Sequence, residues 1–290
     1  MCDNTYNLVQ SRYGDIAKQS TNVQQHDKEE EIARAFGYSA EDLSSLPGRT
    51  NLGLSCGNPV GFANVKEQGE TVLDLGSGSG IDALLAARKV GPNGQAIGVD
   101  MTRSMIELAE KNISKAQLSN AKFIESNIKS IPLPDSSVDC IISNCVINLV
   151  PATDKAAVFR EIARLLKPGG RIAISDILAR KPLPDHLTNN MAMYVGCVAG
   201  ASQIGEYEAY LRQAGFEGTY TAVKRVMSID LLLGVFIVDT KSDLNLYKES
   251  SYLPQSSCCG GGLERTGTPS DIAGLDFNEW AGPLRPFILA

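Results

Sequence analysis

Seven cysteines and only two histidines define the chemistry open to this 290-residue chain. No two cysteines have the C-x-x-C spacing, and the histidines are too few to favour a cysteine–histidine zinc site. Cys56, Cys145 and Cys197 are widely separated in the sequence. Cys145 follows a predicted strand, where a cysteine is either a functional thiol or a small buried hydrophobe. The chain therefore offers thiolates, which are soft ligands, in place of imidazole chemistry.

A glycine-rich turn follows the apolar run of residues 72–75. Its residues include Asp74, Gly76, Ser77, Gly78 and Gly80. A dinucleotide-binding turn needs its third glycine one position later, and a P-loop needs a lysine that this turn lacks. An acid at the strand end followed by G-x-G-x-G resembles the S-adenosylmethionine site of class I methyltransferases. Glycines in such a turn let the backbone come close to a ligand.

Two later strand ends carry further candidate cofactor residues. Asp100, next to Met101, ends an apolar run where a doubly wound fold accepts hydrogen bonds from ribose hydroxyls. A helix cap is the alternative role for Asp100. Asn127 and Ile128 follow the third strand, where an amide could meet a base and an aliphatic chain could cover it. An ordinary polar turn is equally compatible with the second pair.

The elements that must position these residues alternate along the chain. We predict strands at 71–75, 96–100, 122–125, 138–143 and 171–176, with helices at about 81–89, 102–115 and 155–167. This order predicts an α/β fold with a doubly wound, Rossmann-like parallel sheet. Beyond it, 186–214 is predicted helical, and 216–227 and 235–240 are predicted closing strands. We divide the chain into an N-terminal helical cap (1–70), a cofactor-binding core (71–180), a lid with closing strands (181–240) and a C-terminal tail (241–290).

Composition excludes several classes of function. The formal net charge is −6 and 21% of residues are charged, so a nucleic-acid partner is not expected. We find no secretory leader and no apolar run near the ~20 residues of a membrane span, so we expect a cytoplasmic protein that does not bind membranes. Stable disulfides are not expected in such a reducing compartment.

Four segments together resemble arsenite S-adenosylmethionine methyltransferases, over about residues 10–240. They are residues 51–59 around Cys56, the glycine turn, residues 143–149 around Cys145, and residues 194–201 around Cys197. The resemblance implies that these three cysteines hold trivalent arsenic beside the methyl group of S-adenosylmethionine, and that a thiol reductant supports the cycle. It also implies that Tyr13 and Gly14 close over the cofactor, and Asn144 is assigned to the same cofactor site.

The chain departs from the family pattern in one respect. Many members carry a fourth cysteine in the helical region before Cys56, whereas this chain has none between residues 3 and 55. We therefore expect methylated trivalent arsenic to be a better acceptor than arsenite. The tail adds the vicinal pair Cys258 and Cys259, interpreted as exposed thiols. Two alternatives stay open: a methyltransferase for a small carbon or oxygen acceptor such as a quinone precursor, and a non-enzymatic arsenic or metal sensor.

Overall fold

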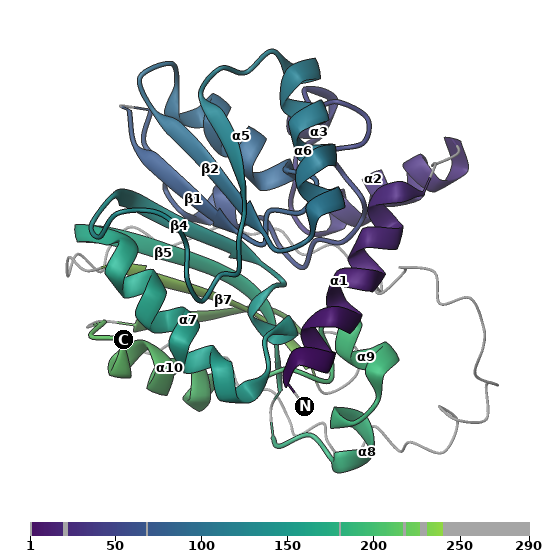
Figure 1. Ribbon diagram of the computed structural model, residues 1–290, viewed down its shortest axis with the longest axis vertical. Helices are drawn as coiled ribbons and strands as arrows, with labels where there is room; N and C mark the ends of the chain where they lie inside the picture. Colours follow the sequence, from purple (N-terminus) through teal and green to yellow (C-terminus); the bar gives the residue numbers. More distant parts are fainter. Residues whose placement is uncertain are drawn as a thin grey trace.

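The computed structural model describes residues 2–19, 23–67, 69–179, 181–216, 219–226 and 231–239. Its centre is a seven-stranded sheet of order β3-β2-β1-β4-β5-β7-β6 (Figure 1). The first five strands in this order are parallel, whereas β7 is antiparallel to both β5 and β6. The strands are β1 (Thr71–Leu75), β2 (Gln95–Asp100), β3 (Ala121–Glu125), β4 (Val138–Asn144), β5 (Leu166–Ala179), β6 (Thr219–Val226) and β7 (Leu231–Asp239). The predicted doubly wound α/β fold is confirmed.

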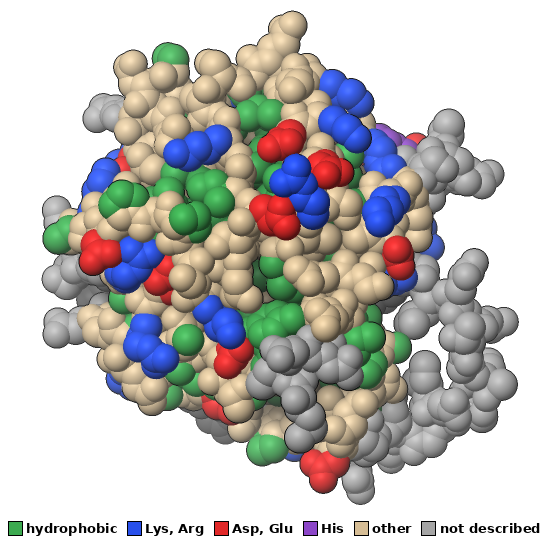
Figure 2. Space-filling model, viewed as in Figure 1, with side chains coloured by type: hydrophobic (Ala, Val, Ile, Leu, Met, Phe, Trp, Pro, Cys, Tyr) green, Lys and Arg blue, Asp and Glu red, His purple; other side chains and the backbone are tan. Residues whose placement is uncertain are grey.

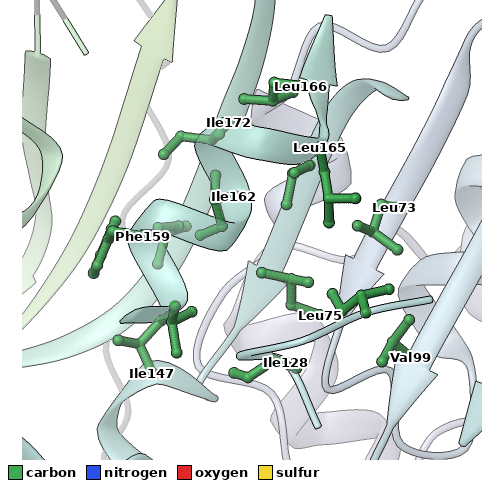
Figure 3. Packing of buried hydrophobic residues seen from close by; sticks show 14 of the residues in the cluster. Leu73, Leu75, Val99, Ile128, Ile147, Phe159, Ile162, Leu165, Leu166 and Ile172 are labelled. Atoms are coloured by element: carbon green, nitrogen blue, oxygen red, sulfur yellow. The ribbon is translucent and has the colours of Figure 1, made fainter. Parts of the chain in front are cut away.

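Apolar side chains on the two faces of the sheet form two separate cores. Because side chains alternate along a strand, Leu73 and Leu75 point to one face and Val72 to the other. The first core packs against α7 (Ala152–Leu165) and α10 (Ile204–Gln213), as the close view in Figure 3 shows for α7. The second core packs against α5 (Ile81–Val90) and the short α4 (Pro59–Phe62). Helices on both faces leave the strand ends as the edge where ligands can bind.

Among the described residues, four helical segments precede β1. They are α1 (Cys2–Lys18), α2 (Val23–Ala35), α3 (Ala40–Ser44) and α4. In Figure 1, α1 runs down the side of the molecule, and it contacts both α6 (Arg103–Ala116) and α9 (Met191–Val195). An N-terminal helical region was predicted; its treatment as a separate domain stays a prediction, as do the other domain boundaries.

The structure differs from the predicted elements mainly after residue 165. β5 begins at Leu166, directly after α7, because Leu166 pairs with Val138 of β4. The region predicted as helical contains α8 (Asp185–Thr188), α9 and α10, separated by a loop that holds Cys197. In that loop Cys197 has a left-handed φ of 65°. The predicted closing strands are present as an antiparallel pair, although β7 starts earlier, at Leu231. The tail from residue 241 lies outside the described residues.

The surface carries charges of both signs. On the face in Figure 2, Lys and Arg side chains are interspersed with Asp and Glu side chains and with hydrophobic ones. Among the surface ion pairs, Arg103 pairs with Glu107 and Glu125, at 3.0 and 3.1 Å. Over the ranges that the structure describes, we find no helix with the length and apolarity needed to cross a membrane.

Candidate active site

A cavity lies beyond the carboxyl ends of β1, β2 and β4. Its wall is built mainly from the glycine turn, the Cys56 loop, one face of α1 and the segments after β2, β3 and β4. Most of the predicted cofactor residues line it: Tyr13, Asp74, Gly76, Ser77, Gly78, Asp100, Met101, Asn127, Ile128 and Asn144. Of the three candidate cysteines, Cys145 lines the same cavity. The fold therefore brings together side chains from distant parts of the sequence at one edge of the sheet.

The glycine turn needs its glycines for two different reasons. Gly76 and Gly78 have φ of 65° and 52°, in the left-handed region that favours glycine. A Cβ on Gly76 would lie 2.4 Å from a methyl carbon of Val146, so the protein itself leaves no room for a side chain. A Cβ on Gly78 would meet no protein atom within 4 Å, although Gly78 lines the cavity. We conclude that Gly78 keeps space open for a ligand.

Three carboxylates, the buried Asp74 and Asp82 and the partly buried Asp100, make the cavity wall acidic. Burial, together with the neighbouring carboxylates of Asp82 and Asp100, holds the pKa of Asp74 well above its ordinary value. Burial also raises the pKa of Asp100, although backbone N–H groups of Thr102 and Gly78 donate to its carboxylate at 2.7 and 3.0 Å. A positively charged ligand would relieve the mutual repulsion of these groups. Thr102, and not Asp100, occupies the N-cap position of α6.

Several buried polar atoms of the cavity wall have no hydrogen-bond partner among the described residues. Within the described part of the chain, Asp74 Oδ2, Ser77 Oγ and Thr50 Oγ1 are buried without a hydrogen-bond partner. Buried polar groups are costly when unsatisfied, so such atoms at a cavity indicate a polar ligand. The acidic wall, the open space at Gly78 and these atoms fit S-adenosylmethionine, which combines a positive sulfonium and amino group with a polar nucleoside.

Helix α1 closes one side of the cavity. Tyr6, Val9 and Tyr13 line it from this helix, and Gln10 Nε2 donates to Met101 O at 2.8 Å. Gly14 lies one residue beyond the lining, and its carbonyl accepts from Ser104 Oγ at 3.4 Å. The predicted Tyr-Gly pair is thus beside the cavity, with Tyr13 in its wall. Its role in holding the cofactor stays a prediction.

The segment after β3 reaches the opposite part of the wall. Ile128 is buried and Asn127 Oδ1 accepts from Lys129 N at 2.9 Å. That bond is the polar turn considered from the sequence, and it coexists with a place in the cavity lining. The role of Asn127 toward a base stays a prediction.

The three candidate cysteines converge beside the cavity, and two of them form a disulfide. Cys56 and Cys145 are bonded, with their Cα atoms 5.6 Å apart. The expectation of no disulfide is therefore wrong for this pair. It was based on the compartment, whereas the fold places the Cys56 loop against the end of β4. Cys140 is fully buried inside β4, and burial raises the pKa of its thiol to about 12.

Cys197 is a thiol and contacts Cys145 of the disulfide. Its Sγ donates to Cys145 O at 3.0 Å and lies 3.9 Å from the Tyr13 hydroxyl. Cys145 and Cys197 are both 5% exposed, and Cys56 packs against the same apolar cluster. Within the described ranges, no three His, Cys, Asp or Glu side chains are placed to hold a metal ion. With Cys56 and Cys145 bonded to each other, a three-sulfur site requires their reduction.

Asp82 and Tyr38 are among the residues of the site that were missed from the sequence. Asp82 lies in the first turn of α5 and lines the cavity. The Tyr38 hydroxyl donates to its carboxylate at 2.8 Å, and Asn144 Nδ2 lies 2.9 Å from its other oxygen. Asp82 had one usable signal, its position two residues after Gly80. Tyr38 had none, because its neighbours in the site are at least 17 residues away.

These features define a class I methyltransferase, and the sequence profile of a methyltransferase-domain family matches residues 66–215. A solved arsenic(III) S-adenosylmethionine methyltransferase from Chlamydomonas reinhardtii is 31% identical, with a TM-score of 0.58 and 72% of each chain covered. Arsenite methyltransferases of Halobacterium salinarum and Homo sapiens are 48% and 36% identical, over 65% and 50% of this chain. The chain belongs to the arsenite methyltransferase family, whose cofactor is S-adenosylmethionine.

The matches have a limited extent. They cover 48% of the Halobacterium protein and 40% of the human protein, so the chain spans about half the length of the curated relatives it matches or less. A demethylmenaquinone methyltransferase of Listeria monocytogenes is 33% identical over 38% of this chain. Membership of the family rests on the solved algal relative, of which 72% is covered.

Proposed function

We propose that this chain transfers the methyl group of S-adenosylmethionine to trivalent arsenic held by the thiolates of Cys56, Cys145 and Cys197. The observation that carries the proposal is the convergence of these cysteines from three separate segments onto the edge of one cavity. Cys145 supplies the link, because it is bonded to Cys56, accepts a hydrogen bond from Cys197 and lines the cavity. Cysteines that served only as small hydrophobic residues would have no reason to gather at the edge of one cavity.

The chemistry of arsenic suits this set of residues. Trivalent arsenic is soft and thiophilic, so sulfur ligands are preferred to imidazole or carboxylate. Three sulfurs leave arsenic its lone pair as the nucleophile, and that lone pair carries no proton, so no general base is needed. The cofactor supplies the methyl group as an electrophile on positively charged sulfur. The protein's part is positioning, which contributes about 7–11 kcal/mol at best.

The residues of the cavity have distinct proposed roles toward the cofactor. Asp100 would accept hydrogen bonds from ribose hydroxyls, and Asn127 with Ile128 would meet the base. Asp74 would balance the positive charge of the cofactor, since its buried carboxylate has an oxygen without a partner among the described residues. Tyr13, close to both the cavity and Cys197, would separate the arsenic site from solvent.

The disulfide supports a thiol reductant as a partner. In the exchange, two reductant thiols give their electrons and protons to the Cys56–Cys145 bond, which becomes two protein thiols while the reductant becomes a disulfide. Only then can both sulfurs ligate arsenic. We assign the protein to the cytoplasm on the same ground, since that compartment supplies such reductants.

The preferred acceptor follows from what packs against Cys56 on its other side. Ile32 and Phe36 of the α2 region form an apolar cluster with Cys56, so this side presents hydrocarbon and not a fourth thiol. Cys56 therefore has Cys145 as its disulfide partner in the described chain. A step in which Cys56 forms a disulfide with a fourth cysteine is therefore not open to the described residues, and we expect methylarsenite to be methylated faster than arsenite. Equal or faster turnover of arsenite would contradict this.

The experiment that tests the proposal uses the purified chain with S-adenosylmethionine, a dithiol reductant and either arsenite or methylarsenite. Arsenic species are then separated and quantified. Cys197→Ser and Cys145→Ser should each abolish methylated product while leaving cofactor affinity intact, and Cys140→Ala is the matched control. A methyltransferase for a carbon or oxygen acceptor would keep its activity in both serine variants. Arsenic binding without any product would indicate a sensor.

A further inference from the structure

A buried hydrogen-bond network grips the Cys56 loop from behind. Asn144 Oδ1 accepts from the backbone N–H of Cys56 at 3.0 Å, and Asn144 Nδ2 donates to Gly57 O at 2.9 Å. The amide thus binds the backbone of two consecutive loop residues, the N–H of Cys56 and the carbonyl of Gly57. Ser55 Oγ adds a longer bond to the Tyr38 hydroxyl, at 3.5 Å. Three consecutive residues of the loop are held by side chains from elsewhere in the fold.

The gripping side chains are themselves held in place. Tyr38, 3% exposed, donates its hydroxyl proton to Asp82 Oδ1 at 2.8 Å and accepts from Asn144 Nδ2 at 2.9 Å. Asn144 Nδ2 also lies 2.9 Å from Asp82 Oδ2. Asp82 is 2% exposed, so these bonds form where water does not compete for them. We call the set of Tyr38, Asp82 and Asn144 the clamp.

We propose that the clamp positions Cys56 against Cys145 whether or not the two sulfurs are bonded, with Tyr38 as a positioning residue. Asn144 immediately precedes Cys145, so a loop bonded to the Asn144 side chain has its cysteine next to Cys145 by construction. The inference adds a positioning role to the proposed arsenic site, and its relevance to arsenic methylation rests on that proposal. The clamp makes the first two sulfur ligands a preformed pair and leaves Cys197 as the third.

The loop is shaped to accept the clamp. A Cβ on Gly57 would lie 2.5 Å from Ser175 Oγ of β5, so only glycine lets the loop approach the sheet this closely. The next residue, Asn58, donates from Nδ2 to Gly37 O at 3.0 Å and accepts from Gly61 N at 2.9 Å. The loop is therefore anchored to the residue before Tyr38 as well. Its position follows from these contacts and does not depend on the disulfide alone.

The test measures how strongly the fold favours the Cys56–Cys145 pair, using neither arsenic nor cofactor. The protein is equilibrated with mixtures of reduced and oxidised dithiothreitol, and the bonded fraction of this pair is quantified by alkylation and peptide mass spectrometry. Tyr38→Phe removes the hydroxyl that links Asp82 to Asn144. We expect the equilibrium constant for forming the disulfide to fall about tenfold, which is about 1.4 kcal/mol.

Tyr207→Phe is the matched control. Tyr207 is also a buried tyrosine whose hydroxyl donates to a buried carboxylate, Asp176 Oδ2, at 2.6 Å. Its hydroxyl lies 3.5 Å from Asn148 Oδ1 and 2.6 Å from Asp176 Oδ2, and neither residue belongs to the clamp. An unchanged equilibrium in Tyr38→Phe, or an equal fall in Tyr207→Phe, would overturn the proposal, because the effect would then be absent or general.

A second measurement needs no variant. In the reduced wild-type protein the clamp predicts that the Cys56 amide, bonded to Asn144, exchanges its hydrogen slowly. Exchange as fast as in an exposed loop would overturn the proposal, since the loop would then be held by the disulfide. If the clamp passes both tests and the protein makes no methylated arsenic, the positioning stands and the proposed reaction fails.

Discussion

Two neighbouring glycines of the turn allow cofactor binding to be separated from folding. We compare Gly78→Ala with Gly76→Ala, because the two positions share a left-handed backbone and differ in what surrounds them. A left-handed φ costs an alanine about 1–2 kcal/mol. Loss of unfolded-state freedom offsets about 0.4–1 kcal/mol of this. Gly78→Ala should therefore destabilise the protein by only about 1 kcal/mol.

Gly76→Ala carries a further cost. Its Cβ would lie 2.4 and 2.6 Å from the two methyl carbons of Val146, which is within the range where atoms must shift. Overpacking of this kind costs about 1–3 kcal/mol, so the total loss should be about 2–4 kcal/mol. Urea unfolding of the two variants under identical conditions measures the difference.

Gly78→Ala, the variant expected to lose less stability, should lose affinity for S-adenosylmethionine. The new methyl group of Gly78→Ala enters the space that the cavity leaves open. We expect its dissociation constant, measured by isothermal titration calorimetry, to rise tenfold or more, equivalent to about 1.4 kcal/mol or more. Wild-type affinity in Gly78→Ala, or destabilisation as large as in Gly76→Ala, would refute the assignment of this space to the cofactor.

Three further predictions address the charged groups and the thiols. Asp100→Ala should weaken cofactor binding roughly tenfold or more, because a hydrogen bond to a charged group contributes about 1.5–3 kcal/mol; calorimetry that shows unchanged affinity would remove Asp100 from the site. Burial raises the pKa of Asp176 from 3.8 to about 6, so its stabilising contribution is complete below about pH 4 and lost as pH rises through 6. At about 1.4 kcal/mol per pKa unit, the stability of the wild type relative to Asp176→Asn should fall by about 2.4 kcal/mol from pH 4 to pH 7.5, and a pH-independent difference would contradict this. Arsenic binding to the reduced protein should weaken as pH falls, because thiols must ionise to become ligands; titrations in Cys140→Ala should match the wild type, whereas those in Cys197→Ser should show weaker binding at every pH.

The parallel core was predictable because its signals are local. The run from Val72 to Leu75 is apolar and ends in glycines, so it identifies a buried strand and its turn without any distant contact. The helix over residues 152–165 was recognised in the same way from its apolar stripe. The boundary after it was less exact, because the pairing of Leu166 with Val138 extends β5 backwards by a contact that the local sequence does not contain.

The site was only partly predictable for a related reason. Strand ends identified Asp74 and Asp100, and the family resemblance identified the cysteines. The Cys56–Cys145 bond and the Tyr38 hydroxyl depend on contacts between residues 89 and 106 positions apart. The role of Asn144 also changed in kind: it lines the cavity, yet its amide serves the Cys56 loop. Spacing in the sequence does not encode such long-range contacts.

The bond between Cys56 and Cys145 makes oxidation a competitor for the same two sulfur atoms. Under the proposed reaction, only the reduced fraction of the protein can take up arsenic, and the apparent dissociation constant equals the intrinsic one divided by that fraction. A protein that is one-tenth reduced would thus seem tenfold weaker, with no change in its site. By the reciprocity of linked equilibria, bound arsenic would hold the pair reduced to the same extent. Affinities for this chain therefore have meaning only at a stated redox potential.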